Sequence, residues 1–245
     1  MNFARSTVSD YKVKVRRKLK YYYGLQIKKD PVCVAHHNWV KDNGDSALRL
    51  NYELNEESIV LDLGGYRGDF AEAIHDRYGC VVYLFEPVRR FYELCQARFS
   101  SNAKIKCLNI GLSDSGGECL ISDEDDGSSL VKNNTNQRAE RVQVVGFTEA
   151  MAELRLQNVD LLKINIEGGE YLVLPHLVKS RFLQNIRYLQ IQFHSFVPDA
   201  AEMRSQIRRD LSITHREQWN YPFIWESWER QINTEPEIDP MGIYL

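Results

Sequence analysis

The chain has 245 residues, of which 43% are hydrophobic and 11% aromatic, enough to bury one core of enzyme size. Its net charge of -3 provides no overall field that would attract nucleic acid, so no nucleic-acid partner is expected. The charge is unevenly divided. Nine Lys or Arg against two Asp give residues 1–30 a net charge of +7, which leaves -10 on the remainder.

Residues 1–57 are expected to form a basic N-terminal arm and a lead-in to the main domain. Between Tyr11 and Lys29, basic residues alternate with aromatic and aliphatic ones, a pattern compatible with a short helix on an anionic membrane or docking partner. A solvated arm that caps the domain explains the same pattern. The lead-in from Pro31 contains a polar turn cluster at 41–45.

No apolar segment indicates a membrane span or a signal peptide. Crossing a bilayer takes ~20 apolar residues, and no stretch approaches that length. The five cysteines are odd in number and have no C-x-x-C spacing, so reduced thiols are expected. Reduced thiols favour a cytoplasmic protein.

Alternating strand and helix patterns begin at residue 58. Ser58–Leu63 is a short apolar run before glycines, typical of a strand buried on both faces. Further strands are expected at 81–85, 105–110, 161–166 and 188–193, and helices at 70–78, 91–99, 148–156 and 168–179. This alternation predicts an α/β, Rossmann-like, doubly wound and mostly parallel sheet over residues 58–198.

Two segments fall outside that alternation. Residues 112–147 contain alternating stretches near 118–122 and 141–145, which predict a β-hairpin insertion with a solvated acidic loop at 123–127. Residues 199–245 form a C-terminal extension with a dense aromatic group at 213–228. These aromatic side chains either provide an acceptor wall or pack in a core.

A glycine turn follows the first strand in a D-x-G-x-x-x-G pattern. Glycines let the backbone approach a ligand, and the next helix begins with free N–H donors. A dinucleotide fingerprint requires glycine at position 63, where the chain has leucine. The turn instead suits the amino and carboxylate groups of S-adenosyl-L-methionine, although a plain tight turn is the alternative. The expected contacts are Asp62, Gly64, Gly65, Tyr66 and Gly68.

Two later strand ends extend this predicted ligand site. Glu86 ends the second strand, where an acid can accept hydrogen bonds from both ribose hydroxyls. Asn109 and Gly111 lie in the region where the third strand ends and are expected to border the adenine. A solvated or capping acid and an ordinary strand end are the simpler explanations.

The fourth strand carries polar residues at its carboxyl end. Lys163, Asn165 and Glu167 alternate, which predicts that all three point to one side of the strand and line a site. His194 ends the neighbouring fifth strand. His194, Glu167 and Asn165 are therefore the candidate catalytic residues, and either of the first two is a candidate base.

The chain resembles the FkbM family of methyltransferases over about residues 58–196. The similar motifs are Val60–Gly68, Phe85–Pro87, Gly111–Asp114 and, most diagnostic, Asp160–Glu170. The resemblance implies a class I methyltransferase fold and O-methylation, often of sugar hydroxyls in glycans, glycolipids or natural products. The family usually has Asp at position 165 and Ala at position 169, so the Asn165 of this chain argues against a role that needs charge there, including metal binding.

S-adenosyl-L-methionine is therefore the expected cofactor and S-adenosylhomocysteine its product. The expected acceptor is a small molecule or glycan with a free hydroxyl. A magnesium ion held by Glu167, Glu170, His194 or Asn165 is an alternative that the amide at position 165 disfavours, and no metal ligand is assigned. Methylation of a protein, lipid or other metabolite and a non-catalytic nucleoside-binding scaffold also remain open.

Overall fold

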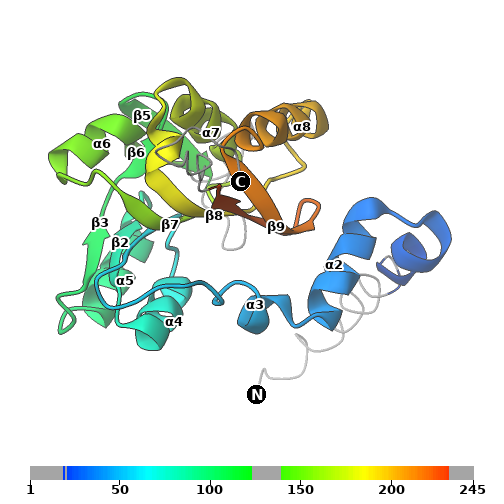
Figure 1. The fold of residues 1–245 in the computed structure, drawn as a ribbon, viewed down its shortest axis with the longest axis horizontal. Helices are drawn as coiled ribbons and strands as arrows, with labels where there is room; N and C mark the ends of the chain where they lie inside the picture. The colour runs from blue at the N-terminus through cyan, green and yellow to red at the C-terminus, as the bar shows by residue number, and fades with distance from the viewer. Residues whose placement is uncertain (1–18, 20, 123–138, 232–245) are drawn as a thin grey trace, which may run out of the picture.

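A seven-stranded sheet runs through the centre of the protein (Figure 1). The computed structural model describes residue 19 and residues 21–122 and 139–231. The strand order is β3-β2-β1-β7-β8-β10-β9; the first five are mutually parallel, and β10 runs antiparallel to both its neighbours. The strands are β1 (Ile59–Leu63), β2 (Val81–Phe85), β3 (Ile105–Leu108), β7 (Val159–Ile164), β8 (Ile186–Ile191), β9 (His215–Tyr221) and β10 (Trp225–Arg230).

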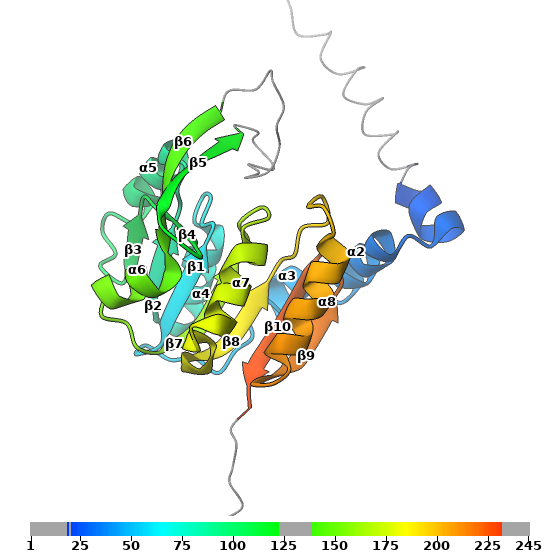
Figure 2. The same ribbon diagram turned by 90° about the horizontal axis from the view of Figure 1, so that it is seen from above.

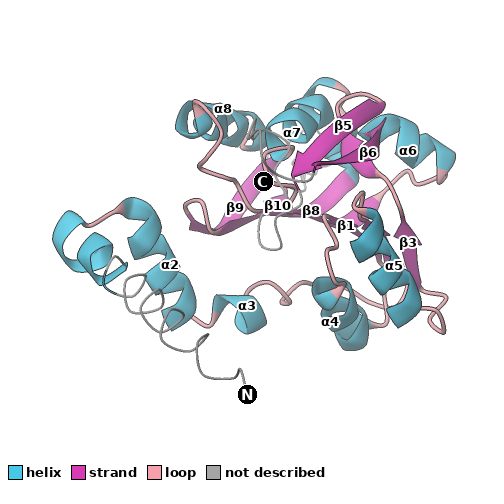
Figure 3. Ribbon diagram, turned by 180° about the vertical axis from the view of Figure 1, so that it is seen from behind, coloured by secondary structure: helices cyan, strands magenta, loops and turns pink. Residues whose placement is uncertain are grey.

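Helices cover both faces of this sheet (Figures 1 and 3). On one face lie α4 (Asp69–Tyr78) and α5 (Arg89–Arg98), and on the other α6 (Phe147–Glu153), α7 (Glu170–Lys179) and α8 (Ala200–Leu211). A short 3-10 helix, η2 (Phe182–Asn185), leads into β8. In β1, Val60 packs into the core beneath α4, while Leu61 and Leu63 pack into the core beneath α6 and α7. Burial on both faces explains the continuous apolar run and confirms the doubly wound α/β prediction.

The insertion forms a second sheet at the carboxyl edge of the first (Figure 2). Its strands are β4 (Gly111–Ser113), β5 (Gly117–Ser122) and β6 (Ala139–Gly146), and the antiparallel pairing of β5 with β6 confirms the predicted hairpin. The parallel pairing of β4 with β6 was not predicted, because the third main strand was expected to end at 110 and no strand was expected at 111–113. The acidic run at 123–127 lies outside the described residues.

The C-terminal extension completes the main sheet. β10 pairs with β8, and Trp225 and Trp228 are buried. Trp219 and Tyr221 pack against Trp39 of the lead-in, with ring centroids 5.6 and 5.1 Å away. The aromatic group at 213–228 therefore packs against the fold, and these four side chains are absent from the wall of the cavity described below.

The lead-in consists of short helices joined to the sheet. These are η1 (Gly24–Lys28), α2 (Pro31–Lys41) and α3 (Gly44–Ala47). α2 begins where the Asp30 side chain accepts from the amides of Val32 and Cys33, and it ends at a turn around Asn43, whose φ is 54°. All five cysteines are free thiols. Among the described helices, none has both the length and the apolar composition that a membrane span requires.

Candidate functional site

A cavity of about 450 Å³ opens between the carboxyl edge of the main sheet and the three-stranded sheet. Both its position and its mixed apolar and polar wall are typical of ligand sites in open α/β folds. The insertion contributes apolar wall residues such as Ile121 and Val144. The predicted site residues that line the cavity are Gly64, Tyr66, Glu86, Gly111, Asn165 and Glu167.

The glycine turn places backbone, rather than side chains, at the cavity. Gly64 has φ 78°, and a Cβ there would lie 1.9 Å from the carbonyl oxygen of Asn165. Gly65 and Gly68 do not line the cavity; a Cβ on Gly65 would meet Leu84, and one on Gly68 would meet Phe99. These two glycines therefore allow close packing beneath the turn, while Gly64 lets two strand ends meet at the wall.

Glu86 joins the ends of β1 and β2. Its carboxylate accepts hydrogen bonds from the amides of Tyr66 (2.8 Å) and Val88 (2.9 Å). Burial raises the pKa of Glu86 to about 7, although these two amides oppose the rise. The glycine turn and the acid after the second strand thus meet at one wall, as the sequence predicted.

Asn109 lies behind that wall instead of lining it. Its amide nitrogen donates to the carbonyl oxygens of Glu86 and Pro87, each at 3.0 Å. Gly111, two residues later, does line the cavity. Asn109 therefore fixes the turn that presents Glu86, and its contact with adenine stays a prediction.

Asp62 and Lys163 form a buried ion pair beneath the glycine turn. The Lys163 Nζ lies 2.7 Å from Asp62 Oδ1 and also donates to the carbonyls of Leu63 (3.3 Å) and Gly64 (2.8 Å). Neither charged residue lines the cavity. The structure thus places Asp62 and Lys163 behind the cavity wall, whereas the sequence predicted that Asp62 contacts the ligand and that Lys163 lines the site. β1 and β7 are adjacent and place the two residues side by side in register. A lone lysine in an apolar strand, which requires a buried counter-charge, was the signal for this pair.

Asn165 and Glu167 lie where β7 has ended. Asn165 Oδ1 is buried and has no hydrogen-bond partner among the described residues. Glu167 adopts φ 50°, a left-handed conformation that is uncommon for residues other than glycine. Its side chain is 27% exposed, and so it can be reached from the cavity that it lines. Tyr66, across the cavity, also has φ 50°.

His194 lies beside Glu167 but is not itself part of the cavity wall. Its Nε2 is 3.4 Å from Glu167 Oε2, and its Nδ1 is 3.0 Å from Glu170 Oε1. Burial lowers the pKa of His194, but the two carboxylates outweigh that effect and raise it to about 9. The two carboxylates therefore favour the protonated form of the imidazole.

The residues at this cavity fit an adenosyl cofactor with an amino acid end. Gly64, Glu86 and Asn165 all line this cavity, and Glu86 contributes a buried carboxylate to its wall. Within residues 21–122 and 139–231, no three His, Cys, Asp or Glu side chains are grouped to hold a metal ion.

Fold and site together define a class I, Rossmann-like methyltransferase. The antiparallel β10 beside the last parallel strand and the cavity after β1, β2 and β7 are the features of that class. The methyltransferase FkbM domain model matches residues 62–221. The chain belongs to the FkbM methyltransferase family, and its cofactor is S-adenosyl-L-methionine.

The chain is similar to several solved structures at low identity. Fibrillarin of Methanococcus jannaschii, a pre-rRNA processing protein, is 11% identical, with coverage of 74% of this chain and 69% of that chain and a TM-score of 0.45. Aeropyrum pernix fibrillarin with natively bound S-adenosyl-L-methionine is 14% identical, with coverage of 76% and 74% and a TM-score of 0.44. An rRNA methylase from Streptococcus thermophilus is 11% identical, with coverage of 73% and 90% and a TM-score of 0.45. A comparison with curated protein sequences finds no match.

Proposed function

We propose that the protein transfers a methyl group to a hydroxyl of a sugar, a glycan or a glycosylated metabolite. The observation that carries this proposal is the Glu167 carboxylate, which lies on the wall of the same cavity as the glycine turn and Glu86. A carboxylate at that position suits an acceptor that must lose a proton during transfer. The resemblance of Asp160–Glu170 to the family motif supports a sugar hydroxyl as the acceptor.

The cofactor is held in this proposal by residues of three strand ends. Glu86 accepts hydrogen bonds from the ribose hydroxyls, and the backbone at Gly64 and Tyr66 meets the amino acid end. Gly111 lies against the adenine. Lys163 acts from behind the wall, because its Nζ donates to the carbonyls of Leu63 and Gly64, and Asp62 pairs with this lysine. When bound, the cofactor supplies an electrophilic methyl group on a sulfonium.

The remaining side chains orient the acceptor and take its proton. Asn165 lines the cavity, and in this proposal it contacts the acceptor or the cofactor. Glu167 takes the hydroxyl proton as the oxygen–carbon bond forms. A carboxylate is strong enough, because the hydroxyl becomes much more acidic as its oxygen is alkylated. Most of the remaining rate acceleration comes from holding the acceptor oxygen in line with the methyl group of the cofactor.

The direct test is methyl transfer from labelled S-adenosyl-L-methionine to a panel of activated sugars and glycans. We expect an acceptor-dependent methyl ether on a sugar oxygen, identified by mass spectrometry. A parallel panel contains protein, lipid and non-sugar metabolite acceptors. A methyl group recovered only on nitrogen, or only in that second panel, would contradict the sugar assignment. Cofactor binding without any acceptor-dependent turnover would instead indicate a nucleoside-binding scaffold.

Cofactor affinity should depend on pH through Glu86. Ribose hydroxyls donate to the ionised carboxylate, and the pKa of Glu86 in the free protein is about 7. Binding of S-adenosylhomocysteine should therefore weaken as pH falls below 7, by up to about tenfold per pH unit. Calorimetry at several pH values measures the effect, and the Glu86→Gln variant should bind weakly without this slope. A wild-type affinity that is flat from pH 5.5 to 8 would remove Glu86 from the ribose site.

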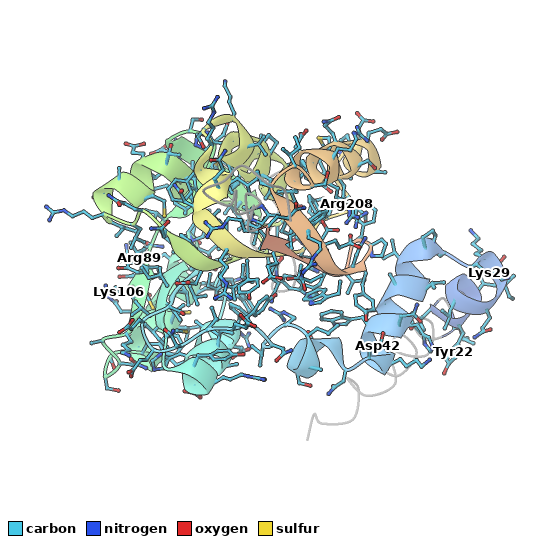
Figure 4. All side chains as sticks on the ribbon, in the orientation of Figure 1. Tyr22, Lys29, Asp42, Arg89, Lys106 and Arg208 are labelled. Carbon is cyan, nitrogen blue, oxygen red and sulfur yellow. The ribbon has the colours of Figure 1, made fainter. Side chains whose placement is uncertain are left out.

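We further propose that the N-terminal arm contacts an anionic membrane surface. Five of the ten strongly exposed large apolar side chains of the described residues lie between residues 19 and 40. Figure 4 shows Tyr22 and Lys29 on the part of the arm that stands away from the main domain. Residues 1–30 carry a net charge of +7. Apolar side chains that insert, together with a positive charge, favour anionic lipid over a nucleic acid. The exposed apolar residues are Leu19, Tyr22, Tyr23, Ile27 and Val40.

Sedimentation of the full-length protein with lipid vesicles tests whether the N-terminal arm binds an anionic membrane. We expect binding to phosphatidylcholine vesicles that contain phosphatidylserine, with loss in high salt and in the double variant Leu19→Glu/Ile27→Glu. The matched control is Ile213→Glu, which adds a charge at a side chain exposed to 76% on the main domain. Equal binding to vesicles of phosphatidylcholine alone, or no binding to either, would contradict the membrane proposal. Salt-sensitive binding to RNA without vesicle binding would replace it with a nucleic-acid partner.

A further inference from the structure

Glu170 is a fully buried carboxylate that the proposed chemistry does not use. It lies at the start of α7 with 0% of its side chain exposed, and it is absent from the cavity wall. Its Oε2 accepts from the amide of Gly168 (2.9 Å), while its Oε1 accepts from both the amide (2.9 Å) and Nδ1 (3.0 Å) of His194. Three donors, two of them from His194, hold this carboxylate in place.

Both ring nitrogens of His194 face carboxylates. Nδ1 meets Glu170, and Nε2 is 3.4 Å from Glu167 Oε2. An ionised carboxylate can only accept hydrogen bonds, and an imidazole donates from both nitrogens only when it carries two protons. The imidazolium form of His194 can therefore donate a hydrogen bond to both carboxylates. Either neutral tautomer would leave one carboxylate facing a ring nitrogen that carries no proton.

The charged groups around His194 also favour its imidazolium form. The two carboxylates that face the ring come from the loop after β7 and from α7. Tyr171 also approaches, but its hydroxyl donates to the backbone carbonyl of His194 and adds no charge to the ring. A buried anion such as Glu170 is costly unless a cation pairs with it, and the cation in contact is His194.

We infer that Glu170 is a positioning residue: it holds His194 as an imidazolium, so that His194 orients Glu167 instead of accepting a proton from the acceptor. The inference rests on the proposed function of Glu167. The hydroxyl proton passes to Glu167, and the proton on His194 Nε2 stays where it is. The ion pair fixes Glu167 Oε2, and the left-handed backbone at Glu167 presents the side chain to the cavity.

Nuclear magnetic resonance of the imidazole nitrogens tests this without any acceptor or cofactor. The full chain is labelled with ¹⁵N at histidine, and His194→Gln identifies the signal among the six histidines. We expect both His194 nitrogens to be protonated at pH 7 and the ring to titrate near 9. A neutral His194 ring at pH 7 in the wild-type protein would overturn the inference.

Glu170→Gln then separates positioning from packing. The variant retains size and hydrogen-bonding groups but loses the charge, so the pKa of His194 should fall from about 9 toward its ordinary value of 6.5. Phe196→Leu is the matched control, because its ring lies 5.4 Å from His194 but carries no charge. An unchanged titration in a folded Glu170→Gln variant, or an equal fall in Phe196→Leu, would overturn the role of Glu170.

Activity supplies a second readout once an acceptor is known. Wild-type kcat should decline as pH rises through about 9, and in Glu170→Gln the decline should move toward neutral pH. Affinity for S-adenosylhomocysteine should be unchanged at pH 7, because Glu170 does not line the cavity. If no acceptor is methylated while His194 titrates as expected, the proposed function fails and the electrostatic arrangement stands. A kcat profile that does not move in Glu170→Gln would contradict the positioning role.

Discussion

Glu167→Gln is expected to reduce kcat for methyl transfer by about 10²–10⁴-fold, the usual contribution of a general base. The amide has the same size as the carboxylate but cannot take the hydroxyl proton, so the loss reflects chemistry more than packing. Affinity for S-adenosylhomocysteine should change little, because the proposed ribose and amino acid contacts are Glu86 and the glycine turn, which line the cavity beside Glu167. Single-turnover rates and calorimetry on the same preparation measure the two quantities.

The backbone at Glu167 provides a control for folding. Its φ of 50° is left-handed, so Glu167→Gly should be more stable than Glu167→Ala, by about 1 kcal/mol, although both lose the carboxylate. Both variants should be as inactive as Glu167→Gln. Activity retained in the stable glycine variant would show that the proton leaves by another route.

Lys163→Met should reduce the free energy of unfolding by about 3–5 kcal/mol, because it leaves the Asp62 carboxylate buried without its cation. Burial lowers the pKa of Lys163, and Asp62 opposes that effect at 2.7 Å. The carbonyls of Leu63 and Gly64 also lose the donor that holds the glycine turn, so cofactor affinity should fall as well. Urea denaturation and calorimetry with S-adenosylhomocysteine measure the two losses.

The double variant Asp62→Asn/Lys163→Met separates the effect of an unpaired buried charge on stability from the effect of the lost lysine donor on cofactor affinity. Removal of both charges should recover much of the lost stability, because no ion is then left unpaired in the core. Cofactor affinity should stay low, since the donor to the Leu63 and Gly64 carbonyls is still missing. A single Lys163→Met variant that loses less than about 1 kcal/mol would mean that the ion pair is not a structural requirement.

The strands of the core were predictable from the chain because each is buried on both faces. The prediction for β2 at 81–85 agrees with the structure, and β7 and β8 each begin two residues earlier than predicted. The predicted strands also ran two residues beyond the observed ends of β7 and β8, into 165–166 and 192–193. Those residues belong to loops at the carboxyl edge of the sheet, where the alternation of side chains no longer indicates a strand.

The roles within the site required the register between strands. Asp62 and Lys163 are about a hundred residues apart in the chain, yet they are neighbours because β1 lies beside β7. Glu170 and His194 meet because α7 begins next to the end of β8. Periodicity assigns a face to a residue but no partner, so the sequence predicted polar residues at the right edge without their pairings.

Local composition thus determined the fold class, the family motifs and the group of residues at the carboxyl edge of the sheet. These properties follow from burial and from the requirements of a glycine turn, which act over a few residues. Only the tertiary structure decided which charges are neutralised in the core, that His194 lies between two carboxylates, and that the C-terminal aromatic residues complete the fold. The physical reason is that electrostatic and packing energies depend on distance in space, and chain separation does not report that distance.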